Sequence, residues 1–194
     1  MKGERSLHGV VDCESTAHVI ASTRQWLEKA VIGLKLCPFA ATPYATNRVR
    51  FCVSEARTQT LLRQDLQREL LELAKADPLE CETTLLIHPW VLQDFFDYNE
   101  FLGECEDVLV ECALADELQI ASFHPQYQFA GVDADDLGNY TNRSPYPMLH
   151  VLRESSVTRA VDGFAGVHQI GSNNIETLRQ LGHERWKQLW DIEK

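Results

Sequence analysis

Residues 139–155, NYTNRSPYPMLHVLRES, gather side chains that can bind anions or transfer protons. Proline is well tolerated in the first turn of a helix, so the prolines of this stretch predict a helix over residues 147–160 with a rigid N-terminus. The guanidinium of Arg143 suits a carboxylate or a phosphate, and the N–H groups of a helix N-terminus add partial positive charge. We therefore expect Asn142, Arg143 and Ser144 to form an anion-binding site. The alternative is that Asn142 or Ser144 only caps the helix and that Arg143 pairs with a surface acid.

His150 and Glu154 stand four residues apart on the predicted helix and so share one of its faces. A carboxylate beside an imidazole fixes which ring nitrogen carries the proton, so Glu154 can orient His150 as a catalytic acid or base. Arg153 lies next to them as a second candidate for holding the anion, and Tyr127 is a candidate wall of the same site. An ordinary ion pair on a helix surface has the same spacing and is the simpler alternative.

The dipeptide His-Pro follows two predicted strands, residues 83–87 and 118–123, and so places His88 and His124 at their ends. If these strands are parallel neighbours, both histidines reach the carboxyl edge of the sheet, where ligands bind in open α/β sheets. If the strands are antiparallel, the histidines lie at opposite edges. His124 is a candidate acid–base group, and both histidines together with His150 would supply ligands for zinc, iron or manganese. The alternative is that His-Pro merely ends a strand.

Cys37 is a candidate nucleophile at the end of the first predicted helix, before Pro38. A nucleophilic thiol needs a lowered pKa, and the dipole at a helix C-terminus works against one. A neighbouring His124 would have to activate it; the alternative is a buried cysteine that packs as a small apolar side chain. None of the six cysteines forms a CxxC pair, which predicts free thiols in a reducing compartment and hence a cytoplasmic protein.

The apolar residues predict strands and amphipathic helices that alternate along the chain. This alternation favours an α/β fold, or an α+β fold, with one layer of about three or more strands and two C-terminal helices. We expect one globular domain over residues 15–194 after a flexible N-terminus, residues 1–14. Residues 40–47 are a predicted loop, and residues 126–145 a long, packed one. The predicted strands are 48–54, 83–87 and 118–123; the predicted helices begin at Ser15 or Thr16, span 58–76, 94–114 and 147–160, and run from Asn173 or Asn174 to about Trp190.

The net charge of −11 argues against some classes of partner. A nucleic-acid-binding surface needs clustered Lys and Arg, which the chain lacks, so neither nucleic acid nor an anionic membrane is an expected partner. No apolar run reaches the roughly 18 residues that cross a membrane, and the first residues lack the apolar core of a signal peptide. The expected partner is a small anionic molecule.

Several stretches together resemble a family of bacterial and plastid proteins of unknown function. They are GLKLCPF at 33–39, FHPQYQF at 123–129, NYTNRSPYP at 139–147 and LHVLRE at 149–154. The resemblance covers roughly residues 18–190. It implies that Cys37, His124 and residues 142–154 belong to one folded unit, and it implies no activity and no catalytic residue.

Three functions are compatible with these patterns. The first is an enzyme for a phosphorylated or carboxylated metabolite, in which His124 and His150 act as acid–base groups or metal ligands. The second is a binding or regulatory module that uses the same anion site without turnover. The third is a protein-interaction domain, or a homo-oligomer, formed through Trp186 and Trp190 of the last helix.

Overall fold

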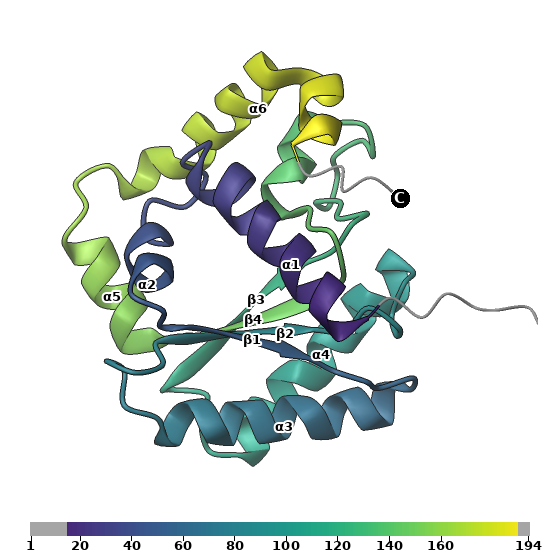
Figure 1. The fold of residues 1–194 in the computed structure, drawn as a ribbon, viewed down its shortest axis with the longest axis vertical. Helices are drawn as coiled ribbons and strands as arrows, with labels where there is room; N and C mark the ends of the chain where they lie inside the picture. Colours follow the sequence, from purple (N-terminus) through teal and green to yellow (C-terminus); the bar gives the residue numbers. More distant parts are fainter. Residues whose placement is uncertain (1–14, 190–194) are drawn as a thin grey trace, which may run out of the picture.

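A four-stranded mixed sheet with the strand order β1-β2-β4-β3 forms the centre of the fold. The computed structural model describes residues 15–189, so the N-terminal segment 1–14, predicted to be flexible, and Trp190 lie outside the described residues. Helices cover both faces of the sheet (Figure 1), and the prediction of a mixed α/β fold is confirmed. The strands are β1 (Val49–Val53), β2 (Thr83–Ile87), β3 (Leu118–Phe123) and β4 (Met148–Arg153).

Most of the predicted helices are present. The amphipathic segments 58–76 and 94–114 form α3 and α4, whereas the predicted loop 40–47 contains a short helix, α2. The helices in chain order are α1 (Thr16–Trp26), the π-helix η1 (Leu27–Ile32), α2 (Ala41–Ala45), α3 (Gln59–Lys75), α4 (Phe95–Glu111), the 3₁₀-helix η2 (Leu137–Asn142), α5 (Glu154–Asp162), the 3₁₀-helix η3 (Val167–Gln169) and α6 (Ile170–Gln188).

The two faces of the sheet belong to two separate apolar cores, because successive side chains of a strand point to opposite faces. On one face, Leu86 of β2 and Leu149 of β4 pack with α3 and α4. On the other face, Leu85 of β2 and Met148 of β4 pack with α1, η1 and α6. Figure 1 shows α3 and α4 below the sheet and α1 and α6 above it.

Residues 148–153 form strand β4, so the prediction of one helix over 147–160 is wrong. Only the second half of that segment is helical, as α5. A short apolar run such as MLHVLR fits a strand or a helix equally well by pattern alone. The pairing decides between them, because β4 is antiparallel to β2 along one edge and to β3 along the other. Both edges of its backbone therefore have hydrogen-bond partners.

The position of β4 fixes the direction of its neighbours. Because β4 is antiparallel to both β2 and β3, those two strands run in the same direction without being neighbours. His88 and His124 follow them directly and so reach the same edge of the sheet, although not through the adjacent parallel strands that the sequence suggested. Arg153 pairs with Leu118, the first residue of β3, and therefore lies at the opposite edge.

The first helix departs from α-helical geometry just before the GLKLCPF stretch. It is capped by Ser15, one of the two residues at which the sequence predicted its start, and continues into the π-helix η1. The N–H of Gly33 donates to the carbonyl of Glu28, five residues earlier, over 2.9 Å. A Cβ at Gly33 would overlap the carbonyl oxygen of Lys29, so this geometry requires glycine. Lys35 then adopts a positive φ of 58°, which turns the chain out of the helix.

The last helix, α6, is held against η2. Tyr140 of η2 stacks on Trp186 with 5.0 Å between ring centroids, and its hydroxyl lies 2.9 Å from Nδ1 of His183. α6 is bent at Gly182, whose φ of 76° is readily adopted only by glycine. Within residues 15–189, no helix has the length and apolar character needed to cross a membrane.

Replacing Gly33 by alanine is expected to lower the free energy of unfolding by about 1–3 kcal/mol, because the added methyl group must displace the carbonyl of Lys29. Urea unfolding followed by circular dichroism measures the change. Gly103 is the matched control, since it is exposed within α4 and a Cβ there would meet no atom within 4 Å. Gly103→Ala should leave stability unchanged or raise it by about 0.5–1 kcal/mol. Equal effects of the two substitutions would contradict the requirement for glycine at Gly33.

Candidate functional site

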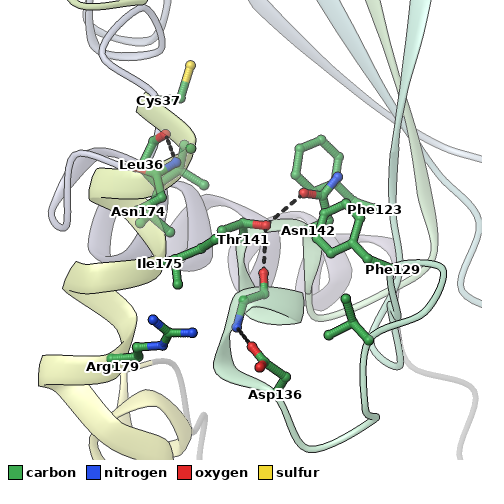
Figure 2. A pocket seen from close by; sticks show the side chains of 14 residues that line it. Leu36, Cys37, Phe123, Phe129, Asp136, Thr141, Asn142, Asn174, Ile175 and Arg179 are labelled. Carbon is green, nitrogen blue, oxygen red and sulfur yellow. Dashed lines mark hydrogen bonds between the residues drawn. The ribbon is translucent and has the colours of Figure 1, made fainter. Parts of the chain in front are cut away.

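A pocket of about 690 Å³ lies between the end of η1, η2 and the first half of α6 (Figure 2). It brings together stretches that are far apart in the sequence: Cys37 of GLKLCPF, Phe123 and Phe129 of FHPQYQF, and Asn142 of NYTNRSPYP. A cavity of this size suits a small organic molecule. The site is thus assembled from several segments and not from the NRSPYP stretch alone.

The walls of the pocket are mostly apolar, with polar groups contributed by the segments around η2 and α6. Such a lining buries an apolar ligand body and orients it through a few polar contacts. The apolar side chains are Val31, Leu36, Phe123, Phe129, Val132 and Ile175; the polar or ionisable ones are Cys37, Asp136, Thr141, Asn142, Asn174 and Arg179.

Several of the polar groups are already used inside the protein. The hydroxyl of Thr141 lies 2.9 Å from the carbonyl of Gly138, to which it can donate. The side-chain amide of Asn174 donates to the carbonyl of Leu36 over 2.7 Å, which ties α6 to the turn after η1. These groups shape the pocket more than they offer contacts to a ligand.

Arg179 is different, because its guanidinium is the one cationic group that lines the pocket among residues 15–189. It is exposed, and within the same described range it makes no hydrogen bond or ion pair. A guanidinium that has no protein partner can bind a ligand carboxylate or phosphate through two parallel hydrogen bonds.

Cys37, the candidate nucleophile, does line the pocket. Burial raises the pKa of its thiol, although the backbone N–H groups of Phe39 and Ala40 act in the opposite direction. The thiol is therefore mainly neutral near pH 7, and burial works against the activation that nucleophilic catalysis needs. His124, the predicted activating base, does not line this pocket.

Asn142 lines the pocket, whereas Ser144 and Tyr127, which were predicted for the same site, do not. All three make hydrogen bonds that hold the long loop in place. The amide of Asn142 donates to the carbonyl of Ser122 over 3.1 Å. Ser144 is buried and donates to the carbonyl of Tyr146 over 2.7 Å. The hydroxyl of Tyr127 lies 3.3 Å from that of Ser122. The element that follows Ser144 is strand β4 and not a helix, so neither Asn142 nor Ser144 caps the start of a helix.

Arg143 uses its donors inside the protein. Its Nε donates to the carbonyl of Tyr127 over 3.2 Å, and one terminal nitrogen donates to the carbonyl of Ala134 over 2.7 Å. The guanidinium also lies 4.4 Å from the centre of the Tyr140 ring. These contacts order the long loop, and Arg143 does not line the pocket of Cys37 and Arg179.

Arg153 is far from the predicted anion site, because it lies at the other edge of the sheet. One of its terminal nitrogens donates to the carbonyls of Leu73, Ala76 and Cys81, at 2.6, 2.7 and 3.2 Å. It thus binds the C-terminal end of α3, whose last carbonyl groups have no partner within the helix. The role of Arg153 here is structural.

His88 and His124 lie close together at one edge of the sheet, on the α4 side. Both are fully buried, and the ring of Tyr98 contacts both, with centroid distances of 5.8 and 5.1 Å. The Tyr98 hydroxyl donates to the carbonyl of Met148 over 2.9 Å and accepts from the N–H of Phe123 over 3.0 Å. Tyr98 therefore ties the end of β3 to the start of β4.

Hydrogen bonds assign the tautomers of these two histidines. Nδ1 of His124 accepts from the N–H of Gln126 over 3.0 Å, so its Nε2 carries the proton and donates to the carbonyl of Leu92 over 3.2 Å. Nδ1 of His88 donates to the carbonyl of Val91 over 3.1 Å, and its Nε2 has no partner within the described residues. Burial lowers the pKa of His88 to about 4 and also lowers that of His124, so both rings are neutral near pH 7.

His150 lies on the opposite face of the sheet, where its ring is 6.2 Å from that of Phe123. The hydroxyl of Thr83 donates to the carbonyl of Val151, so its oxygen accepts from Nε2 of His150 over 2.7 Å. Burial lowers the pKa of His150 to about 4. Glu154 begins α5, beyond the end of β4, so the shared helix face predicted for these two residues does not exist.

The three histidines therefore do not form one ligand set. His88 and His124 are together, but His150 faces the other side of the sheet. Among residues 15–189, no three His, Cys, Asp or Glu side chains lie close enough to hold a metal ion between them. The divalent-metal hypothesis has no assembled site in this part of the chain.

Sequence reasoning missed Asp136 and Arg179. Asp136 belongs to an acidic loop run of the kind that usually stays in solvent. Arg179 is one of several charged residues on an amphipathic helix, and no motif distinguishes it from its neighbours. Only the packing of α6 against η2 brings the two to one pocket.

Comparison with known families supports the resemblance drawn from the sequence. A family model described as "Protein of unknown function (DUF1415)" matches residues 18–188. A search of curated proteins gave no match, and neither did a search of solved structures.

The free energy of unfolding is expected to fall as the pH decreases from about 6.5 to about 4. The pKa of His88 is about 4 in the folded protein and roughly 6.5 in an unfolded chain, so the unfolded state binds more protons between these values. The shift in the pKa of His88 corresponds to roughly 3–4 kcal/mol at most. Urea unfolding at several pH values measures the slope. In His88→Asn, whose amide nitrogen can take the place of Nδ1 and keep the hydrogen bond to Val91, the slope should be shallower; equal slopes would contradict this account.

Proposed function

We propose that this chain, which belongs to the DUF1415 family of proteins of unknown function, binds a small carboxylated or phosphorylated molecule in the pocket beside α6. The observation that carries the proposal is the guanidinium of Arg179, which lines a mostly apolar pocket without a described protein partner. Arg179 takes the role that the sequence had suggested for Arg143 and Arg153.

The apolar walls determine the rest of the ligand. Leu36, Phe123 and Ile175 offer a surface that an apolar ligand body can cover, and covering it stabilises the complex by about 25 cal/mol for each Å² removed from water. A fully polar anion would leave these side chains without partners. The proposed ligand therefore consists of an anionic group attached to an apolar body.

Binding is better supported than catalysis by the side chains that line the pocket. The two ionisable groups there besides Arg179 are the thiol of Cys37, whose pKa is raised, and the carboxylate of Asp136. If the protein is an enzyme, Asp136 is the group that can accept a proton from a bound ligand. His124 and His150 lie outside the pocket, so a role for them in turnover would require a different site.

Within residues 15–189, no observation specifically supports a protein-interaction domain formed through the last helix, or a cytoplasmic location. Trp186, the predicted interaction residue, is buried and stacks on Tyr140, so it contributes to the packing of α6. A cytoplasmic location remains part of the proposal, and five free cysteines among residues 15–189 are compatible with it.

Isothermal titration calorimetry tests the proposal with a fixed panel: leucine, phenylalanine, their des-amino acids 4-methylpentanoate and 3-phenylpropanoate, and phenyl phosphate. At least one of these is expected to bind the wild-type protein. Arg179→Gln should weaken that binding about tenfold, because charge-assisted hydrogen bonds contribute about 1.5–3 kcal/mol and every 1.4 kcal/mol is a factor of ten.

Arg185→Gln is the matched control, since Arg185 is exposed on the same helix, carries the same charge and does not line the pocket. It should bind the panel as the wild-type protein does. Val132→Trp adds a second test, because it fills the pocket without changing any charge and should abolish binding. The proposal fails if no member of the panel binds, or if Arg179→Gln and Arg185→Gln have the same effect.

A further inference from the structure

We infer that the ligand is a zwitterion, an α-amino acid with an apolar side chain, whose carboxylate binds Arg179 and whose ammonium binds Asp136. The inference rests on the proposed function and adds the chemical class of the ligand. Its basis is that the pocket holds one cationic and one anionic side chain, and that these two do not pair with each other.

Asp136 is held in place with part of its carboxylate available. It precedes η2, and its Oδ1 accepts a hydrogen bond from the N–H of Gly138 over 2.6 Å. This bond fixes the side chain at the pocket wall, where Asp136 is partly buried. Its second oxygen, Oδ2, has no hydrogen bond or ion pair within residues 15–189. A ligand N–H donor can therefore reach an acceptor that is already oriented.

The balance of charge separates a zwitterion from a simple anion. Arg179 and Asp136 together give the lining no net charge, and the neutral thiol of Cys37 does not alter this sum. A ligand with only a negative charge would gain from Arg179 but be repelled by Asp136, because like charges a few ångströms apart disfavour each other. A phosphate monoester, with about −1.5 to −2 charges, would be repelled more strongly. An amino acid head group carries no net charge and offers a carboxylate to Arg179 and an ammonium to Asp136.

The shape of the pocket accommodates the remainder of such a ligand. Figure 2 shows Arg179 and Asp136 towards one end of the pocket and Cys37 at the other. Ile175 lies between Arg179 and Asn174 on α6, and Leu36 lies near Cys37. A head group held by the two charges would thus direct its side chain along apolar surface. A volume of about 690 Å³ is ample for a branched or aromatic side chain.

The test compares amino acids with analogues that lack one charge. Calorimetric titrations of the full-length protein with leucine and phenylalanine are set against their des-amino acids and against the amines 3-methylbutylamine and 2-phenylethylamine. In the wild-type protein, at least one amino acid is expected to bind about tenfold more tightly than either of its analogues. In Asp136→Asn, the amino acid should lose this advantage and bind no better than its des-amino acid.

Asp136→Asn removes the charge but can keep the fold, because an asparagine oxygen accepts the same N–H bond of Gly138. The matched control is Asp135→Asn, since Asp135 is the neighbouring, exposed carboxylate and does not line this pocket. It should keep the wild-type preference for the amino acid.

The possible outcomes separate this inference from the proposed function. If a des-amino acid or phenyl phosphate binds the wild-type protein as tightly as any amino acid, and Arg179→Gln weakens that binding, the zwitterion is wrong and anion binding stands. If neither amino acids nor simple anions bind, both fail. If Asp136→Asn and Asp135→Asn reduce the preference equally, Asp136 does not contact the ligand and the inference is overturned.

Discussion

Strand β4 is hydrogen-bonded to β2 along one edge and to β3 along the other, and the rest of the fold depends on this double pairing. Without β4, the parallel pair of β1 and β2 would have no connection to β3 within the sheet. Because β3 and β4 are antiparallel neighbours, the chain must return to the same edge between them. Residues 124–147 make that return, which explains how a long segment stays ordered: its ends are fixed by the sheet.

At both edges of the sheet, polar residues that the sequence predicted to be catalytic, metal-binding or anion-binding make hydrogen bonds inside the protein. Tyr98, His88 and His124 form a buried, neutral cluster that bonds to backbone groups of neighbouring loops. Arg143 and Arg153 bind backbone carbonyls at opposite edges of the sheet. Buried polar groups need such partners, since an unpaired group away from water costs roughly 1–3 kcal/mol. Residues of a catalytic type are thus used here to hold loops and helix ends in place.

The pocket, in contrast, depends on charged side chains that are not fully used in contacts within the protein. Arg179 and Asp136 stand at a wall built by α6 and the loop before η2, and neither pairs with the other. The wall exists because Trp186 and Tyr140 pack α6 against η2, and because Asn174 binds the turn that follows η1. The π-helix makes that turn possible by allowing Gly33 to bond five residues back. A ligand would therefore contact segments that are held together by one ring stack and two hydrogen bonds.

The sequence by itself determined the class of the fold, the positions of β2, β3, α3 and α4, the start of the first helix to within one residue and the membership of a family of unknown function. These depend on local periodicity and on the order of residues. Only the tertiary structure decided that residues 148–153 form a strand, because a short apolar run satisfies either period until pairing partners are present. That choice moved His150 to the other face of the sheet and separated it from Glu154. Tertiary packing also brought Arg179 and Asp136 to one pocket, since no spacing along the chain records that η2 and α6 lie against each other.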